Sequence, residues 1–182
     1  MKLKPYLVIA FLAVTTCYAQ SSTEINEYNA DDNLPKNEVS LNALYLILGA
    51  FEINYEYLLN EDSGVGISAM YTFDDDLWIF KHQITGYYRH YFGKKYAGGV
   101  YGEVFAMYNS TEEYYSSYSG GSFIANYENS HNFALGFGFG TKLISNKNLL
   151  LDAGLGLGRN IISSSNDEWL IPRFKIGFGY RF

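Results

Sequence analysis

Apolar and polar residues alternate without a break along the last nine positions of the chain, FKIGFGYRF. A side-chain period of two is that of a β-strand, so one face of this segment is apolar and the other is polar or small. The apolar positions are Phe174, Ile176, Phe178, Tyr180 and Phe182. The pattern predicts a final strand with Lys175 and Arg181 on its polar face.

Seven further segments of strand length alternate in the same way, and most are separated by turn residues such as NEDSG, GKK and SNKN. The first is predicted from Val39 to Ile47, with Tyr45 on its apolar face, and ends before Gly49. The other predicted ranges are 51–57, 65–73, 78–92, 96–108, 131–143 and 149–158. Eight strands joined as neighbours predict an up-and-down meander, which loses its unpaired edges by closing into a barrel.

The content of the two faces indicates which one lines the interior. The polar face carries charges of both signs and rows of glycine, which suit the narrow interior of an eight-strand barrel. A soluble barrel keeps its large apolar residues inside, whereas here they occupy the other face. The sequence therefore predicts an all-β fold, an eight-stranded antiparallel up-and-down transmembrane β-barrel whose apolar face meets lipid.

Charged residues on the predicted interior face form a candidate lumen charge network. Arg181 is expected near Glu38 across the closing seam, and Lys142 and Asp152 flank the SNKN turn at matching heights. Because buried charges are tolerated when they are paired, we expect a structural plug rather than an ion pathway. The predicted members are Glu38, Glu52, Glu56, Lys81, Arg89, Glu103, Lys142, Asp152, Arg173, Lys175 and Arg181.

The connections are predicted to be short on the periplasmic side and longer on the outer side, as in outer-membrane barrels. The longest, residues 109–130, is rich in Tyr and Ser, a composition typical of contact surfaces. Its candidate surface-contact residues are Tyr114, Tyr115, Tyr118, Phe123 and Tyr127. The outer connections also carry acidic residues, but without EF-hand spacing, so solvated loops are favoured over a divalent-cation site and no metal ligand is predicted.

The N-terminal residues have the layout of a secretory signal peptide. Two lysines precede an apolar run that closes on small residues, so residues 1–19 are predicted to be removed on export, together with Cys17, the single cysteine. Residues 20–36 predict a flexible periplasmic lead-in, and residues 37–182 the barrel. Losing two lysines and no acid takes the formal charge from −6 to −8, which disfavours nucleic acid as a partner.

Residues suited to catalysis are not evident. His82, His90 and His131 fall on predicted lipid-facing or rim positions, and no nucleophile, base and acid can be placed at one height. No catalytic or cofactor-binding residue and no cofactor is therefore predicted. Arg159 falls on the leucine face of its strand, where it could bind a lipid phosphate, or a bulge could turn it inward.

Five stretches carry a family resemblance: NEVSLNALYLILGAFEINYEYLL, GYYRHYF, GVYGEVF, LGLGRN and the closing IPRFKIGFGYRF. Over residues 36–182, this ordered set resembles an uncharacterised family (a domain of unknown function) of small outer-membrane β-barrels, similar to the OmpA, OmpW and PagP type of eight-strand barrel. The resemblance implies a barrel in the outer membrane of a Gram-negative bacterium, and no activity. The five apolar residues of the final strand resemble the signal that barrel-assembly machinery recognises.

The sequence thus favours a non-enzymatic outer-membrane protein, a monomer with a plugged lumen and a structural or surface-interaction role. Its expected partners are outer-membrane lipid and lipopolysaccharide, the barrel-assembly machinery during biogenesis, and an extracellular partner that the sequence does not identify. One alternative is an OmpW-like conduit for small hydrophobic molecules or ions, which Leu44, Leu46 and Met70 could line. A less favoured alternative is an outer-membrane lipid-modifying enzyme.

Overall fold

A computed structural model defines the fold and describes residues 34–73, 78, 80–119, 122–163 and 170–182. Internal contacts divide the chain into two units, Met1–Leu34 and Pro35–Phe182. All strands of the described residues belong to the second unit. The predicted signal peptide and most of the predicted lead-in lie outside the described residues and stay predictions.

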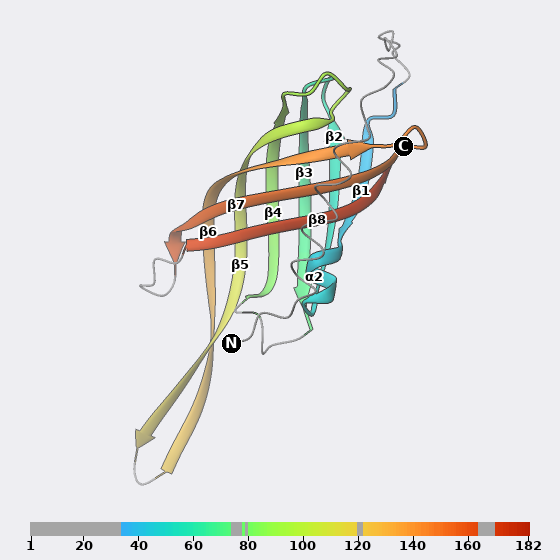
Figure 1. The fold of residues 1–182 in the computed structure, drawn as a ribbon. Coiled ribbons are helices and arrows are strands. Elements are labelled where there is room, and N and C mark those ends of the chain that lie inside the picture. The colour runs from blue at the N-terminus through green and yellow to red at the C-terminus, as the bar shows by residue number, and fades with distance from the viewer. Residues whose placement is uncertain (1–33, 74–77, 79, 120–121, 164–169) are drawn as a thin grey trace, which may run out of the picture. The chain divides into compact units, whose positions relative to one another are not determined.

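Eight strands form a closed barrel in which each pairs antiparallel with its neighbours, and β1 pairs with β8 to complete the circle (Figure 1). The elements are β1 (Asn37–Asn42), α2 (Ala43–Ile47), β2 (Ala50–Leu58), β3 (Ser63–Thr72), β4 (Phe80–Tyr91), β5 (Gly99–Ser119), β6 (Ser122–Ile144), β7 (Leu149–Ser163) and β8 (Leu170–Arg181). The predicted eight-stranded antiparallel barrel is confirmed. Within the described part of the chain, no helix has the length and apolar character to cross a membrane.

Side chains alternate between the lumen and the outside along the strands. In β2, Glu52 and Glu56 are buried in the lumen, whereas Phe51 and Ile53 are exposed on the outside. From β2 to β8, large hydrophobic residues are exposed on the outer face, and most buried residues are polar or charged. This distribution is the reverse of that in a soluble globular protein, which places apolar residues inside.

The first predicted strand is too long, because the chain leaves the sheet at Asn42 and forms α2. Tyr45, predicted on the lipid face, is instead 4% exposed and packs with Ala50. Residues 43–48 read ALYLIL, so they lack the alternation of a half-buried strand, and Ala and Leu favour a helix. The chain then turns at Gly49, whose φ of 89° suits glycine.

The prediction that residues 109–130 form a connection without strands is wrong. β5 and β6 continue through this segment as a paired hairpin to Ser119 and Ser122. β4 accompanies β5 only to Thr111, and β7 accompanies β6 only to Asn132. The rest of the hairpin runs beyond the neighbouring strands, as Figure 1 shows. Tyr, which occurs four times in this segment, is a residue that strands favour.

The two ends of the barrel differ. The turns β2–β3, β4–β5 and β6–β7 lie with the C-terminus at one end, which we call the turn end (Figure 1). The opposite end, which we call the hairpin end, carries α2 and the β5–β6 hairpin. The turn end carries the segments 59–62, 92–98 and 145–148, whereas the longest excursion from the barrel, the part of the β5–β6 hairpin beyond Thr111 and Asn132, lies at the hairpin end.

Candidate functional site

Aromatic rings inside the lumen lie over glycines of the neighbouring strand. In the strand register, Tyr87 is paired with Gly66, and Phe105 with Gly136. A Cβ atom on either glycine would come within 2.3 Å of the ring opposite. Tyr101 lies over its own glycine partner in β6 in the same way. The glycine rows are thus the space into which the rings fit, and the rings narrow the lumen around the charges.

Arg89 lies at the centre of the lumen charge network and is 1% exposed. Its guanidinium donates to three carboxylates: Glu103 at 2.6 Å, Asp152 at 2.9 Å and Glu56 at 3.0 Å. These acids belong to β5, β7 and β2, so one cation from β4 links four strands across the lumen. The rings of Tyr87 and Tyr101 flank the guanidinium carbon at 4.6 and 4.3 Å, as cation–π contacts require.

Lys142 lies in the part of the network nearest the turn end. Its ammonium donates to Glu38 at 2.5 Å and to Glu56 at 3.1 Å. It also donates to the hydroxyl of Tyr91, which in turn donates to Glu56. Across the β1–β8 seam, Arg181 is the register partner of Glu38 and donates to it at 2.7 Å.

Arg173 and Glu52 end the network toward the hairpin end. Arg173 donates to Glu103, and its second terminal nitrogen lies 3.5 Å from Glu52 and 3.3 Å from the hydroxyl of Ser68. Glu52 also accepts a hydrogen bond from the side-chain amide of Asn42 at 2.7 Å. The last carboxylate on this side is therefore bound to the end of β1 as well as to β8.

The network is balanced in charge. Lys175 completes it by pairing with Asp152 at 2.8 Å. The buried members are five acids and five bases: Glu38, Glu52, Glu56, Glu103, Asp152, Arg89, Lys142, Arg173, Lys175 and Arg181. Lys81, the eleventh predicted member, is half-exposed at the start of β4 and lies outside this buried set. Equal numbers of paired charges let the lumen stay neutral although it is desolvated.

A cavity of about 10 Å³ remains in the network, beside Arg89, Glu103 and Lys175. That volume is roughly what one water molecule requires. An ion crossing the lumen at this level would have to separate ion pairs that span the barrel. The geometry therefore supports a plug rather than a pore.

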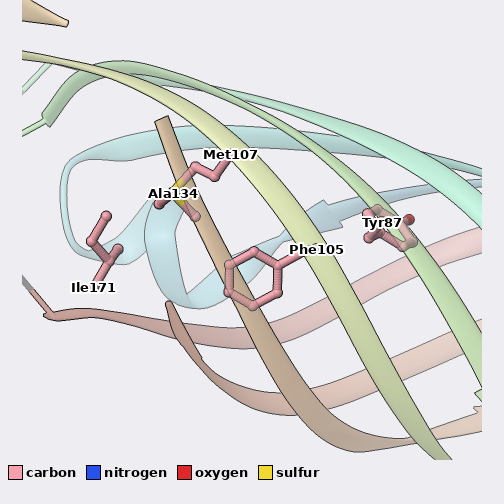
Figure 2. Close-up of a cluster of buried hydrophobic side chains, with 5 residues drawn as sticks. All are labelled: Tyr87, Phe105, Met107, Ala134 and Ile171. Atoms are coloured by element: carbon pink, nitrogen blue, oxygen red, sulfur yellow. The ribbon is translucent and has the colours of Figure 1, made fainter. Parts of the chain in front are cut away.

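The lumen changes character beyond Arg173. An apolar cluster, shown in Figure 2, consists of Tyr87, Phe105, Met107, Ala134 and Ile171. Next to it in the strand register, Asn132 donates to Asn109 at 3.1 Å. Within the described residues, the buried Nδ2 of Asn109 and Oδ1 of Asn160 find no hydrogen-bond partner. The buried side chains of the hairpin-end half of the lumen are thus apolar, amide and hydroxyl groups.

The predicted assembly signal lies on the outer face of β8. Its five residues are all exposed: Phe174, Ile176, Phe178, Tyr180 and Phe182. The last residue also closes the seam, because the backbone of Phe182 exchanges hydrogen bonds of 2.8 and 3.0 Å with that of Asn37. Recognition of these residues by an assembly machinery stays a prediction.

The candidate surface-contact residues belong to the β5–β6 hairpin. The backbone register places Tyr114 opposite Tyr127 and Tyr118 opposite Phe123, with Tyr115 on the β5 strand between them. Their side chains lie outside the described residues, and so do the acidic positions at 74–76 and 167–168. In the described part of the chain, no three potential ligands among His, Cys, Asp and Glu come together as a metal site would require.

The three histidines lie on the outer side of the barrel rather than with the buried carboxylates. His82 and His131 are exposed, and His90 is half-buried with its ring edge-on to Phe92. His131 stacks on Tyr108, with its Nδ1 2.9 Å from the tyrosine hydroxyl. The structure therefore does not bring these three histidines together with the buried carboxylates.

The structure also places Arg159 and the three residues proposed to line a conduit. Arg159 is exposed on the outer face of β7, between Leu135 and Leu170 in the register, so a bulge does not turn it inward. Of the residues proposed to line a conduit, Met70 is buried in an apolar cluster with Leu44 at its margin. The third, Leu46, is 48% exposed and does not line the lumen.

Sequence reasoning missed the role of the lumen tyrosines. Tyr101 donates to Asp152 at 2.7 Å, and Tyr91 links Lys142 to Glu56. A signal was present, because Tyr91 shares its parity with Arg89 in GYYRHYF. A tyrosine on the glycine-rich, charged lumen face has its hydroxyl within reach of carboxylates.

The fold and the site together define a closed eight-strand β-barrel with an apolar exterior and a paired-charge interior. No protein-family model matches the chain, and no curated protein matches it. Among solved structures, the N-terminal β-barrel domain of Pseudomonas aeruginosa OprF is similar, with 15% identity, a TM-score of 0.44, and coverage of 82% of this chain and 98% of that chain.

Two other solved structures are similar at the same level. Neisserial surface protein A (NspA) has 16% identity and a TM-score of 0.46, over 81% of this chain and 95% of that chain. The outer membrane protein Ail of Yersinia pestis has 17% identity and a TM-score of 0.39, over 81% of this chain and 99% of that chain. The likeness is one of fold.

Proposed function

We propose that the protein is a non-enzymatic β-barrel of a Gram-negative outer membrane, with a plugged lumen and a structural or surface-interaction role. The reversed distribution of side chains carries the proposal, because paired charges fill the inside and large hydrophobic residues cover the outside of β2 to β8. Soluble monomers rarely expose continuous apolar patches larger than a few hundred Å². In a bilayer, such a surface meets lipid, and a closed barrel leaves no strand edge unpaired.

The orientation follows from the connections. Outer-membrane barrels keep short turns on the periplasmic side, so the turn end faces the periplasm and the hairpin end faces outward. Arg159 lies on the outer face toward the hairpin end, ten residues beyond the first residue of β7, which fits an interface of the bilayer rather than its hydrocarbon core. At that level a guanidinium can reach the phosphates of lipid or lipopolysaccharide. Export by a signal peptide and delivery by the assembly machinery belong to the same proposal.

The β5–β6 hairpin is the proposed contact element. Beyond Thr111 and Asn132, its strands have no barrel neighbour among the described residues, so they extend outward from the wall. Tyr and Ser dominate this segment, and both are frequent in surfaces that bind other proteins. The proposed partner is an extracellular macromolecule, and the barrel itself acts as the anchor, as a monomer.

A charge placed on the outer face tests the membrane location. Phe137 is 65% exposed near the middle of the barrel part of β6, and Leu149 is 57% exposed at the turn end. In lipid, Phe137→Lys should cost about 2–4 kcal/mol and Leu149→Lys about 0–1 kcal/mol. Urea unfolding of each variant, refolded in bilayers and followed by heat-modifiable gel mobility, measures the difference. Equal and negligible costs would mean that the outer face is in water.

A further inference from the structure

The β1–β8 seam is closed in two different ways along its length. At the turn end, the strands form a ladder from the pair Glu38–Arg181 to the pair Asn42–Gly177. β8 then continues to Leu170, and among the described residues no strand pairs with this side of it. Its other side stays paired with β7 over the whole length. A strand is therefore missing from the wall at the hairpin end, between β8 and β2.

α2 occupies the missing position, and the ladder is replaced by side-chain hydrogen bonds from Asn42, the last residue of β1, and from Tyr45 in α2. Asn42 donates through Nδ2 to the carbonyl of Phe174 at 3.0 Å and accepts at Oδ1 from the backbone N–H of Ile176 at 3.2 Å. The hydroxyl of Tyr45 accepts from the N–H of Phe174 at 3.3 Å. These bonds satisfy polar groups of β8 that a neighbouring strand would otherwise satisfy.

Pro172 fits the same unpaired edge. In an antiparallel strand, every second residue directs its N–H and C=O toward the same neighbour. Phe174 and Ile176 direct theirs toward α2, so position 172 has this orientation too. Proline has no N–H and is confined to edges, strand starts and bulges of sheets. Position 172 therefore presents no N–H to the unpaired edge.

Apolar contacts hold α2 in place. Ile47 is 82% exposed on its outer side, whereas Tyr45 packs inward in one cluster with Met70. At the end of the helix, the indole of Trp78 donates to the carbonyl of Leu48 at 2.7 Å. The Trp78 and Tyr45 rings meet edge-on, with centroids 4.7 Å apart. The helix is thus attached by a few side-chain contacts rather than by a ladder.

We propose that this helix-closed part of the seam is a lateral gate, through which a hydrocarbon chain of a bilayer lipid enters the hairpin-end half of the lumen when α2 moves outward. The gate rests on the proposed membrane location. Regions held by few contacts open at lower free energy than cooperative ladders, so opening is expected here and not at the turn end. Opening would release the hydrogen bond from Asn42 to Glu52 at the end of the charge network and would leave the ion pairs of Arg89 and Lys142 in place.

The chemistry of the opening selects a hydrocarbon chain as the occupant. Outside, Ile47 faces the lipid of the proposed bilayer. Inside, the first contacts are the ring of Tyr45 and the thioether of Met70, a flexible side chain that adapts to irregular apolar shapes. One missing strand widens the wall by about 4.8 Å, a width suited to an extended, unbranched chain. A charged head group would remain outside, since this half of the lumen has no buried charge beyond Arg173 and Glu52 among the described residues.

Amide hydrogen exchange in lipid nanodiscs tests whether the gate opens. The amides of Phe174 and Ile176 should exchange at least about tenfold faster than those of Phe178 and Tyr180 on the same strand. Asn42→Ala should speed both gate amides further, and Asn37→Ala, the matched change at the turn end of β1, should not. Equal protection of all four amides in the parent protein would overturn the gate.

Quenching of Trp78 by lipids brominated at mid-chain tests whether a chain enters. Trp169→Phe leaves Trp78 as the single tryptophan. In this background, Asn42→Ala should raise the quenching about twofold by shifting the population toward the open gate, and Asn37→Ala should leave it unchanged. If quenching is unchanged in Asn42→Ala while the amide of Phe174 exchanges faster, α2 moves but admits no hydrocarbon chain. That result would overturn the proposed occupant.

Two controls keep the interpretation clear. If Asn42→Ala does not reach the heat-modifiable folded form, Tyr45→Phe carries both measurements, because it removes only the hydroxyl that holds Phe174. Flotation of the parent protein with vesicles is measured first. A protein that does not float with the vesicles contradicts the membrane location. A protein that floats but whose seam amides are all equally protected contradicts only the gate.

Discussion

The two halves of the lumen are built on different principles, although the same strands form both. In the turn-end half, Arg89 and Lys142 bind carboxylates from several strands, so each cation ties together parts of the wall. In the hairpin-end half, Met107, Ala134 and Ile171 pack by contact alone, and a helix replaces a strand in the seam. The comparison indicates that stability is concentrated at the turn end, which leaves the hairpin end free to open or to bind.

The largest effect is expected from removing the central cation. Arg89→Met keeps the length of the side chain but leaves Glu56, Glu103 and Asp152 without their shared partner. Breaking buried ion pairs in this way should cost about 3–5 kcal/mol of unfolding free energy. Urea unfolding of the refolded protein measures the loss.

A matched change on the same strand sharpens the comparison. Gln83 is buried in the hairpin-end half of β4 and donates to Thr85 at 3.2 Å. Gln83→Met removes one neutral hydrogen bond and should cost about 0.5–1.5 kcal/mol. If Arg89→Met cost no more than Gln83→Met, the two halves would contribute alike, and the difference drawn between them would be wrong.

An intermediate effect is expected where the rings fit against glycine. A Cβ on Gly136 would lie 2.3 Å from the Phe105 ring and 2.6 Å from the carbonyl oxygen of Leu157, so Gly136→Ala overpacks the lumen. Overpacking typically costs about 1–3 kcal/mol.

Gly86 provides the control for this change, because no atom lies within 4 Å of a Cβ added there. Gly86→Ala should be neutral or stabilise by up to about 1 kcal/mol, since it lowers the backbone entropy of the unfolded chain. Thermal unfolding of the two variants side by side gives the comparison. If the Gly136→Ala protein unfolded at the same temperature as the Gly86→Ala protein, the rings would not be confined by the glycine row.

The barrel could be predicted from sequence because two different surroundings act on every strand. Lipid outside and a narrow lumen inside impose a period of two, and charges such as Arg89 among rows of glycine mark the inner face. The same reasoning failed for residues 43–48, where six apolar residues in a row have no period. It also failed for the hairpin, whose strands continue beyond their barrel neighbours.

The candidate site was predictable in its buried members and in part of its pairing, because Arg181 binds Glu38 across the seam as expected. Register reasoning set Lys142 beside Asp152, and these residues are indeed register partners. Yet Lys142 binds Glu38 and Glu56, while Asp152 binds Arg89. Long side chains cross a narrow lumen as easily as they reach a neighbouring strand, so register alone does not determine their partners.

The smallest effect on folding is expected from shortening the β5–β6 hairpin. This change separates the role of the hairpin from that of the charge network that plugs the lumen. Replacing residues 114–127 by Asn-Gly keeps Glu113 and Glu128 as register partners and closes the hairpin with a two-residue turn. The difference in gel mobility between unheated and heated samples should persist, because the removed residues have no barrel neighbour among the described residues.

Single-channel recording of both proteins gives the decisive readout. No resolved conductance steps are expected from either, since the paired charges that close the lumen belong to the turn-end half. Steps that appear only after shortening would make the hairpin a gate for ions and would move the plug from the charge network to the hairpin end. Silence in both would leave surface binding as the function to pursue, with the shortened protein as the control that lacks the contact element.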